Sequence, residues 1–257
     1  MRRIVIILTI SASLYPCFAG INGSVRIAAI RVSFLEDDSP GTTGNGSFLL
    51  NAPIDTCGRY TIDPVPHDRS YFESQLVAVN NYYRSISYGK FSLDLDQSIV
   101  FPLSDENSYV LPKKMDYYHP YNQTDLHDQR VTELFRDAIE TAYNDDEIDF
   151  SNYDHVVVFH AGIGQDFSLP FLDPTPEDIP STFIDGDMLQ EYVGGVLQFG
   201  TATINQGIIL PETQNHLFYQ ESENIFFDAE EPCDYQYGLT GTFALMLGFA
   251  IGLPPLW

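Results

Sequence analysis

The spacing of hydrophobic positions changes several times along the chain, and each change predicts an element. Residues 70–83 and 128–143 repeat apolar side chains at helical spacing, and Ser70 followed by Glu73 forms a capping box, so two amphipathic helices are expected. Residues 165–187 are rich in proline and aspartate and predict a loop. Strands are predicted at 24–34, 91–95, 153–160 and 203–210, and a wholly apolar helix at 239–251. This alternation is typical of an α/β or α+β domain whose last helix packs on a sheet.

The first residues have the layout of a secretory signal peptide, with two arginines, an apolar run and a small residue, Ala19, before a cleavage point. The apolar run is shorter than the ~18 residues that a membrane span needs, so no stable membrane anchor is expected. Pro16 stands where a lipoprotein signal has a small residue, which argues against lipidation of Cys17. We therefore expect residues 1–19 to be a signal peptide, and the domain at 20–257 to be secreted, extracellular or periplasmic.

The chain is strongly acidic, with 36 Asp and Glu against 12 Lys and Arg and a formal net charge of −24. Two arginines belong to the predicted signal peptide, so its removal leaves 10 basic against 36 acidic residues, or −26. This charge repels nucleic acid and anionic membranes, so neither is an expected partner, and it is compatible with a solvated acidic surface or with calcium binding. Two cysteines remain after cleavage, Cys57 and Cys233, and in an exported protein they predict one disulfide.

The apolar helix ends in a spacing that matters for chemistry, because Gly248 and the exit 252–254, Gly-Leu-Pro, follow the frame of a zinc-peptidase helix. In peptidases of the HExxHxxGxxD type, two histidines four residues apart bind zinc, a glutamate is the general base, and a third ligand follows a glycine turn. The positions of the two histidines, the base and the third ligand are occupied by Leu245, Phe249, Met246 and Pro255. Leucine, phenylalanine and proline side chains offer a metal no lone pair, and a thioether suits copper(I) rather than zinc.

Short segments in a fixed order carry a wider resemblance. They are 58–64, 66–72, 81–85, 87–90, 153–154, 158–162, 173–182 and 252–254. Through them, residues 24–257 resemble the immune-inhibitor-A-type secreted metallopeptidases, a zincin group. The resemblance implies a zincin-like α/β (α+β) fold, in which a mixed twisted sheet packs against the active-site helix, with zinc as cofactor and proteolysis as activity. It also implies a C-terminal subdomain after that helix, which does not appear before Trp257, so the domain is expected to be incomplete at its C-terminus.

The family's His-Glu-x-Gly-His motif falls on residues 245–249, where only Gly248 matches. The resemblance therefore gives this chain no catalytic residue and no zinc ligand, and no cofactor is expected. The apolar replacements predict a buried helix in which Leu245 and Phe249 fill the former metal pocket. We expect a catalytically inactive pseudopeptidase that acts as a binding or structural module for proteins or peptides. The alternative is an active secreted metalloendopeptidase that hydrolyses peptide bonds with zinc-activated water.

Three further sets of residues are candidates for binding or structural roles. Carboxylates in a flexible loop are the ligands that calcium prefers, and they predict a possible calcium site at Asp173, Asp178, Asp185 and Asp187. A calcium-stabilised surface or adhesion domain is therefore a third hypothesis for the function. His160 ends the clearest strand, where binding residues often lie, so it is either a binding residue or a satisfied structural histidine. His67, in Pro-His-Asp-Arg, is predicted to fix its loop through a hydrogen bond.

Overall fold

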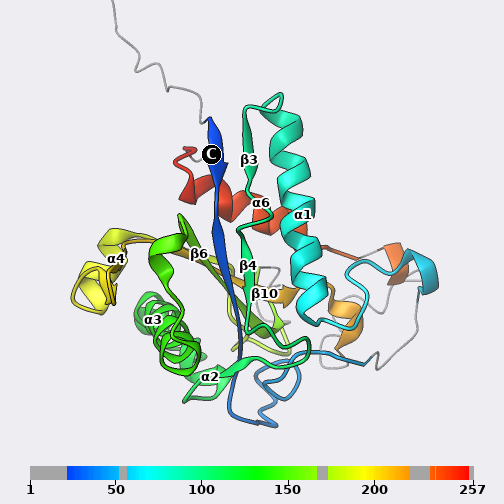
Figure 1. The fold of residues 1–257 in the computed structure, drawn as a ribbon. Coiled ribbons are helices and arrows are strands. Elements are labelled where there is room, and N and C mark those ends of the chain that lie inside the picture. The colour runs from blue at the N-terminus through cyan, green and yellow to red at the C-terminus, as the bar shows by residue number, and fades with distance from the viewer. Residues whose placement is uncertain (1–21, 52–56, 167–172, 220–231, 235, 255–257) are drawn as a thin grey trace, which may run out of the picture.

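A mixed six-stranded sheet lies at the centre of the computed structural model, which describes residues 22–51, 57–166, 173–219, 232–234 and 236–254 (Figure 1). The strand order is β4-β2-β6-β10-β7, and β5 also pairs with β2. The strands are β2 (Ile27–Ser33), β4 (Ile99–Phe101), β5 (Tyr109–Val110), β6 (His155–Ile163), β7 (Thr182–Ile184) and β10 (Gly207–Thr213). Every neighbouring pair is parallel except β7, which runs antiparallel to β10 at the edge of the sheet.

Helices cover both faces of this sheet, as Figure 1 shows. On one face, α1 (Arg69–Ile86) and α6 (Leu239–Ala250) pack against side chains that include Ala29 and Phe159. On the other face, α3 (His127–Asp146) and α2 (Met115–Tyr118) pack against side chains that include Ile30 and Val158. Strands that are covered on both sides need apolar residues at successive positions, which explains the apolar runs 27–30 in β2 and 156–159 in β6. The mixed α/β class expected from the sequence is confirmed.

Smaller elements complete the described chain. β1 (Gly23–Val25) pairs in parallel with β3 (Phe91–Leu93), and β8 (Leu197–Phe199) pairs antiparallel with β9 (Ala202–Ile204). α4 (Gly186–Tyr192) lies beside α3. Short 3-10 helices occur at Gly58–Tyr60, Thr124–Leu126, Phe150–Asn152, His216–Phe218 and Pro232–Asp234. β7 and α4 both fall within or beside the segment 165–187 that was predicted to be a loop, because neither is long enough to show a hydrophobic period.

The first predicted helix begins one residue earlier than expected, and its cap was assigned to the wrong residue. Asp68, not Ser70, is the N-cap, because its carboxylate accepts a 3.1 Å hydrogen bond from the backbone N–H of Tyr71. Glu73 does not complete a capping box but forms a 2.8 Å ion pair with Arg69. The other long helices also lie where they were predicted, α3 from its periodicity and α6 from its apolar run, within three residues at each end.

A buried cation joins strand β2 to the loop after β4. Arg31 of β2 is fully buried, and its guanidinium donates hydrogen bonds to the backbone carbonyls of Pro102, Ser104 and Asp105. Burial is the main influence on this group and lowers the pKa of Arg31 to about 10, so the guanidinium stays charged at neutral pH. Three carbonyl dipoles take the place of a carboxylate partner, and they keep this loop against the sheet.

The predicted disulfide is present. Cys57 and Cys233 are bonded, which ties the segment before α1 to the segment before α6 across 176 positions of sequence. None of the helices in the described ranges is long and apolar enough to cross a membrane. The predicted signal peptide at 1–19 and the third-ligand position Pro255 lie outside the described residues.

Candidate functional site

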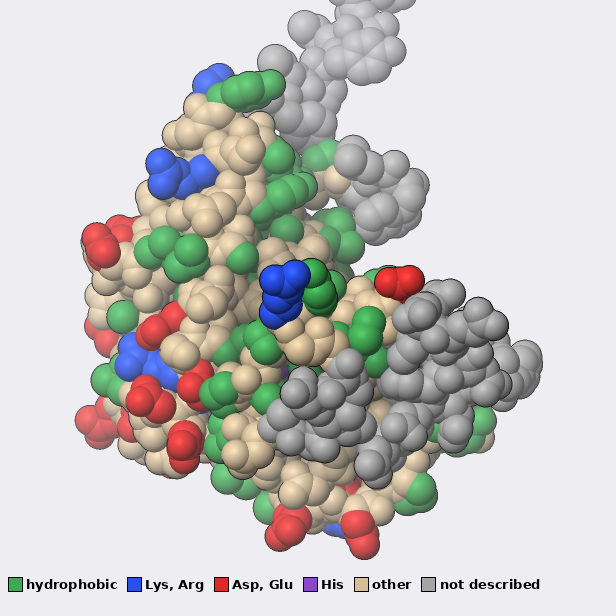
Figure 2. Space-filling view, turned by 90° about the vertical axis from the view of Figure 1, so that its right-hand side faces the viewer, with side chains coloured by type: hydrophobic (Ala, Val, Ile, Leu, Met, Phe, Trp, Pro, Cys, Tyr) green, Lys and Arg blue, Asp and Glu red, His purple; other side chains and the backbone are tan. Residues whose placement is uncertain are grey.

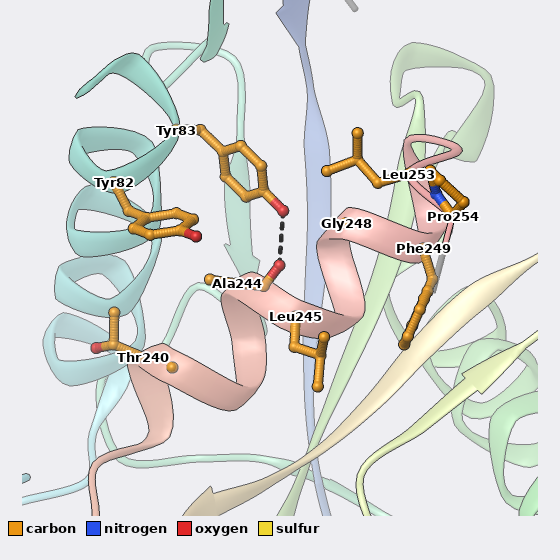
Figure 3. A pocket seen from close by; sticks show the side chains of 10 residues that line it. Tyr82, Tyr83, Thr240, Ala244, Leu245, Gly248, Phe249, Leu253 and Pro254 are labelled. Carbon is orange, nitrogen blue, oxygen red and sulfur yellow. Dashed lines mark hydrogen bonds between the residues drawn. The ribbon is translucent and has the colours of Figure 1, made fainter. Parts of the chain in front are cut away.

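The helix that carries the peptidase-like frame, α6, is fixed on one side by the sheet and by α1. Phe243 and Leu247 are fully buried, and the ring of Phe243 lies 5.5 Å from that of Phe159 on β6. The hydroxyl of Tyr83 on α1 donates a 2.6 Å hydrogen bond to the carbonyl of Ala244 (Figure 3). Burial raises the pKa of Tyr83, so this hydroxyl keeps the proton that it donates. The buried side of α6 is therefore held firmly, and this determines which residues its other side presents.

The expectation that Leu245 is buried in a former metal pocket is wrong. Leu245 is 44 % exposed, and Met246 and Phe249 are half-buried. A helix completes one turn every 3.6 residues, so the residue midway between the buried Phe243 and Leu247 must point away from the core. Because α6 is apolar on every side, its sequence could not indicate which side faces the sheet. The two positions that would carry histidines in an active enzyme thus remain at least partly open to solvent.

These exposed positions border an apolar groove between α1 and α6, with a volume of about 340 Å³ (Figure 3). Its lining residues are Tyr82, Tyr83, Thr240, Gly241, Ala244, Leu245, Gly248, Phe249, Leu253 and Pro254. A side-chain carbon added at Gly241 would meet no atom within 4 Å, so the groove is open above this residue. At Gly248 the same carbon would lie 3.1 Å from the Tyr83 hydroxyl, so glycine permits the close approach of the two helices there. No binding role for Tyr82 or Tyr83 was predicted from the sequence.

The edge strand β7 lies next to the C-terminal end of α6. Its Phe183 ring is 6.2 Å from the ring of Phe249, and Gln206, just before β10, donates a 2.9 Å hydrogen bond to the carbonyl of Ala250. Within the part of the chain that the structure describes, β7 pairs only with β10, so its outer edge has no partner strand. An unpaired edge exposes backbone N–H and C=O groups that another extended chain can bind.

The three described residues at the peptidase-like positions do not fit zinc. Leu245, Met246 and Phe249 carry no imidazole or carboxylate. In the described ranges, no group of three or more His, Cys, Asp or Glu side chains is arranged to hold a metal ion. The four candidate calcium ligands have different local roles. Asp185 caps α4 by accepting from the backbone of Met188, and Asp187 is exposed in the first turn of that helix. Asp173 accepts hydrogen bonds from Gln165 and from the backbone of Thr175. Calcium at these residues stays a prediction.

Asp178, the fourth candidate, is fully buried where two loops meet. Its Oδ1 accepts hydrogen bonds from the backbone N–H and from the hydroxyl of Thr43, at 2.7 and 3.0 Å. Burial is the largest influence on this group, and it raises the pKa of Asp178 to about 8 although the hydrogen bonds from Thr43 favour the carboxylate. At neutral pH Asp178 is therefore mostly a neutral acid, which is the less suitable form for binding a cation.

His160, the candidate binding residue at the end of the clearest strand, is also fully buried. Its Nδ1 lies 2.9 Å from the carbonyl of Ala161, and its ring lies 6.0 Å from that of Phe34. Burial lowers the pKa of His160 to about 4, so the imidazole is neutral and Nδ1 donates to the carbonyl. Nε2 is buried and has no hydrogen-bond partner among the described residues, so both roles of His160 stay predictions.

A buried ion pair was not predicted from the sequence. Nδ1 of His67 lies 3.5 Å from a carboxylate oxygen of Glu212, the penultimate residue of β10, and both side chains are fully buried. Glu212 also accepts hydrogen bonds from the hydroxyl of Tyr219 and from the backbone N–H of Leu49. Nε2 of His67 lies 2.9 Å from the carbonyl of Asp63, which confirms that His67 fixes its loop. Burial opposes the charged imidazole, but Glu212 outweighs burial and the pKa of His67 is raised.

Compared with models of known protein families and with curated proteins, the chain matches none of them. The function is therefore inferred from the chemistry of the residues themselves. The apolar groove and the neighbouring strand edge both adjoin Phe249, and none of the described residues that line the groove is acidic or a histidine.

Proposed function

We propose that this chain is an exported, zincin-like peptidase domain without zinc chemistry that acts as a binding module for peptides or proteins. The observation that carries the proposal is the exposed apolar side of α6, where Leu245 and Phe249 stand at the two histidine positions beside an open groove. A hydrolase that activates water with zinc needs three protein ligands and a carboxylate base, and these positions provide neither. The groove therefore supports binding without cleavage.

The neighbouring elements suit an extended peptide. A peptide strand that pairs with the outer edge of β7 gains backbone hydrogen bonds, and side chains on one of its faces then point toward α6. Apolar side chains that enter the groove give up contact with water, at roughly 25 cal/mol for each Å² of apolar surface. The Cys57–Cys233 disulfide supports the proposed location outside the cytoplasm, because disulfides persist mainly in oxidising compartments.

The test compares binding and cleavage on one probe, a fluorescein-labelled unfolded protein, with the zinc content of the pure chain measured in parallel. We expect binding without cleavage and no stoichiometric zinc. Leu245→Asp should abolish binding, because a charge at the groove must be desolvated when an apolar segment binds. Val77→Asp on α1 is the matched control, because Val77 has the same 44 % exposure and does not line the groove. Zinc-dependent cleavage of the probe would instead show an active peptidase.

A further inference from the structure

The groove beside α6 does not end at Leu253. A second hollow of about 410 Å³ adjoins it and shares two of its lining residues, Tyr83 and Leu253. Its other lining residues are Asn22, Ile86, Ser87, Tyr88, Lys90, Phe91 and Ile251. We call the two hollows together the α1–α6 strip. The strip has no acidic lining residue, although the chain carries 36 acidic residues. In Figure 2, hydrophobic and basic side chains occupy the upper part of the visible face, and acidic side chains gather lower down.

One cation of the strip has no internal counter-charge. The other described basic side chains, apart from Arg84, have carboxylate, carbonyl or aromatic partners. In the described ranges the ammonium group of Lys90 has no such partner, and Lys90 is exposed at the second hollow. In a chain with a net charge of −24, an unpaired cation at the end of an apolar surface favours a ligand with an anionic end.

We infer that the α1–α6 strip binds the C-terminal end of an apolar peptide, with the terminal carboxylate at Lys90 and apolar side chains in the two hollows. This inference rests on the proposed function and names the part of a partner that is recognised. The terminal carboxylate of an apolar peptide brings a single negative charge, and Lys90 offsets it. A second copy of this acidic chain would be repelled. The rim of the strip carries the hydroxyls of Tyr82 and Tyr88, which are 48 % and 92 % exposed. Such hydroxyls can bond peptide groups, which a plain hydrocarbon chain does not have.

The test measures fluorescence anisotropy with a fluorescein-labelled octapeptide of apolar residues, made with a free C-terminal acid and as the C-terminal amide. We expect the acid to bind about threefold to fivefold more tightly than the amide, since Lys90 is exposed. Lys90→Gln should remove this preference. Arg84→Gln is the matched control, because Arg84 is exposed near the end of α1, its side chain has no partner in the described chain, and it lines neither hollow of the strip. Its variant should keep the preference.

A second pair of variants tests the location. Gly241→Leu should weaken binding of both peptides at least about tenfold, because its side chain enters the space that the ligand needs. Gly241→Ala should keep binding, because the added carbon meets no atom within 4 Å and alanine favours a helix. Equal binding of acid and amide would overturn the inference and leave peptide binding in place. If neither peptide binds, or if dodecanoate binds where the peptides do not, the proposed function fails as well.

Discussion

The neutral acid at Asp178 gives the sharpest test of the electrostatics, through the substitution Asp178→Asn. In the folded chain the pKa of Asp178 is about 8, against an ordinary value of 3.8 in the unfolded chain. The folded state therefore keeps a proton that the unfolded state releases, and the free energy of unfolding falls as the pH rises from about 4 to about 8. Asparagine has nearly the same shape and does not titrate, so the variant is free of this loss.

The magnitude follows from the gap between the working pH and 3.8, at about 1.4 kcal/mol for each pH unit. At pH 7 the variant should be more stable than the wild type by about 4 kcal/mol, and at pH 5 by about 2 kcal/mol. Both values assume that the two chains are equally stable at low pH, where Asp178 is neutral in both states. Because other titrating groups are the same in the two chains, they cancel in the difference.

The assay is urea unfolding of both chains at pH 5 and pH 7, without and with calcium. Asp149→Asn is a control with the opposite sign, because the hydroxyl of Ser151 lowers the pKa of Asp149, and this variant should lose stability. The reasoning is refuted if Asp178→Asn is less stable than the wild type at pH 7 and the difference does not grow from pH 5. Calcium that stabilises the wild type but not the variant would show that Asp178 is an ionised calcium ligand.

Three further changes have calculable effects on stability. Replacing Cys57 and Cys233 by serine removes a cross-link across 176 positions, and the chain-entropy relation gives a loss of up to about 5 kcal/mol, measured as a lower urea midpoint; an unchanged midpoint would contradict it. The ion pair of His67 and Glu212 stabilises the folded chain by its full amount below the unfolded-state pKa of His67, about 6.5. This contribution is lost as the pH rises through the raised folded-state pKa of His67. His67→Ala should cost about 3–5 kcal/mol at pH 6, and thermal melts at increasing pH should show the difference from wild type shrinking. Arg31→Met leaves three buried carbonyls without their donor and should cost about 3 kcal/mol or more, so a variant as stable as the wild type would show that water replaces the guanidinium.

The features that the sequence predicted correctly are those that repeat over many residues or depend on residue type alone. The helices α1 and α3 are long enough for their apolar periodicity to be visible, α6 is an apolar run of helical length, and the disulfide followed from two cysteines in a chain expected to be exported. The strand β7 could not be found, because three residues between prolines and aspartates show no period. Its place at the sheet edge comes entirely from its pairing with β10.

The candidate site shows the same limit. The sequence showed that Leu245 and Phe249 cannot bind zinc, because that depends on the chemistry of each side chain. It could not show that Leu245 is exposed, because α6 is apolar all round and only its contacts with α1 and β10 decide which side is covered. The pairing of His67 with Glu212 was out of reach for a similar reason, since the two residues are brought together by the fold from distant parts of the sequence.

The position of β2 between β4 and β6 also determines when this chain can fold. β2 is synthesised before its partners β4 and β6, and Asp154, which bonds Arg26 just before β2, lies 128 residues further on. A growing chain therefore has β2, a mostly apolar strand, unpaired until β4 and β6 have been made. Such a strand pairs late and with strands that are far away in the sequence. Folding is therefore slow and waits until β6 has been synthesised. For the export that we propose this delay would be useful, because a chain in which β2 is still unpaired is open enough to be threaded through a membrane channel.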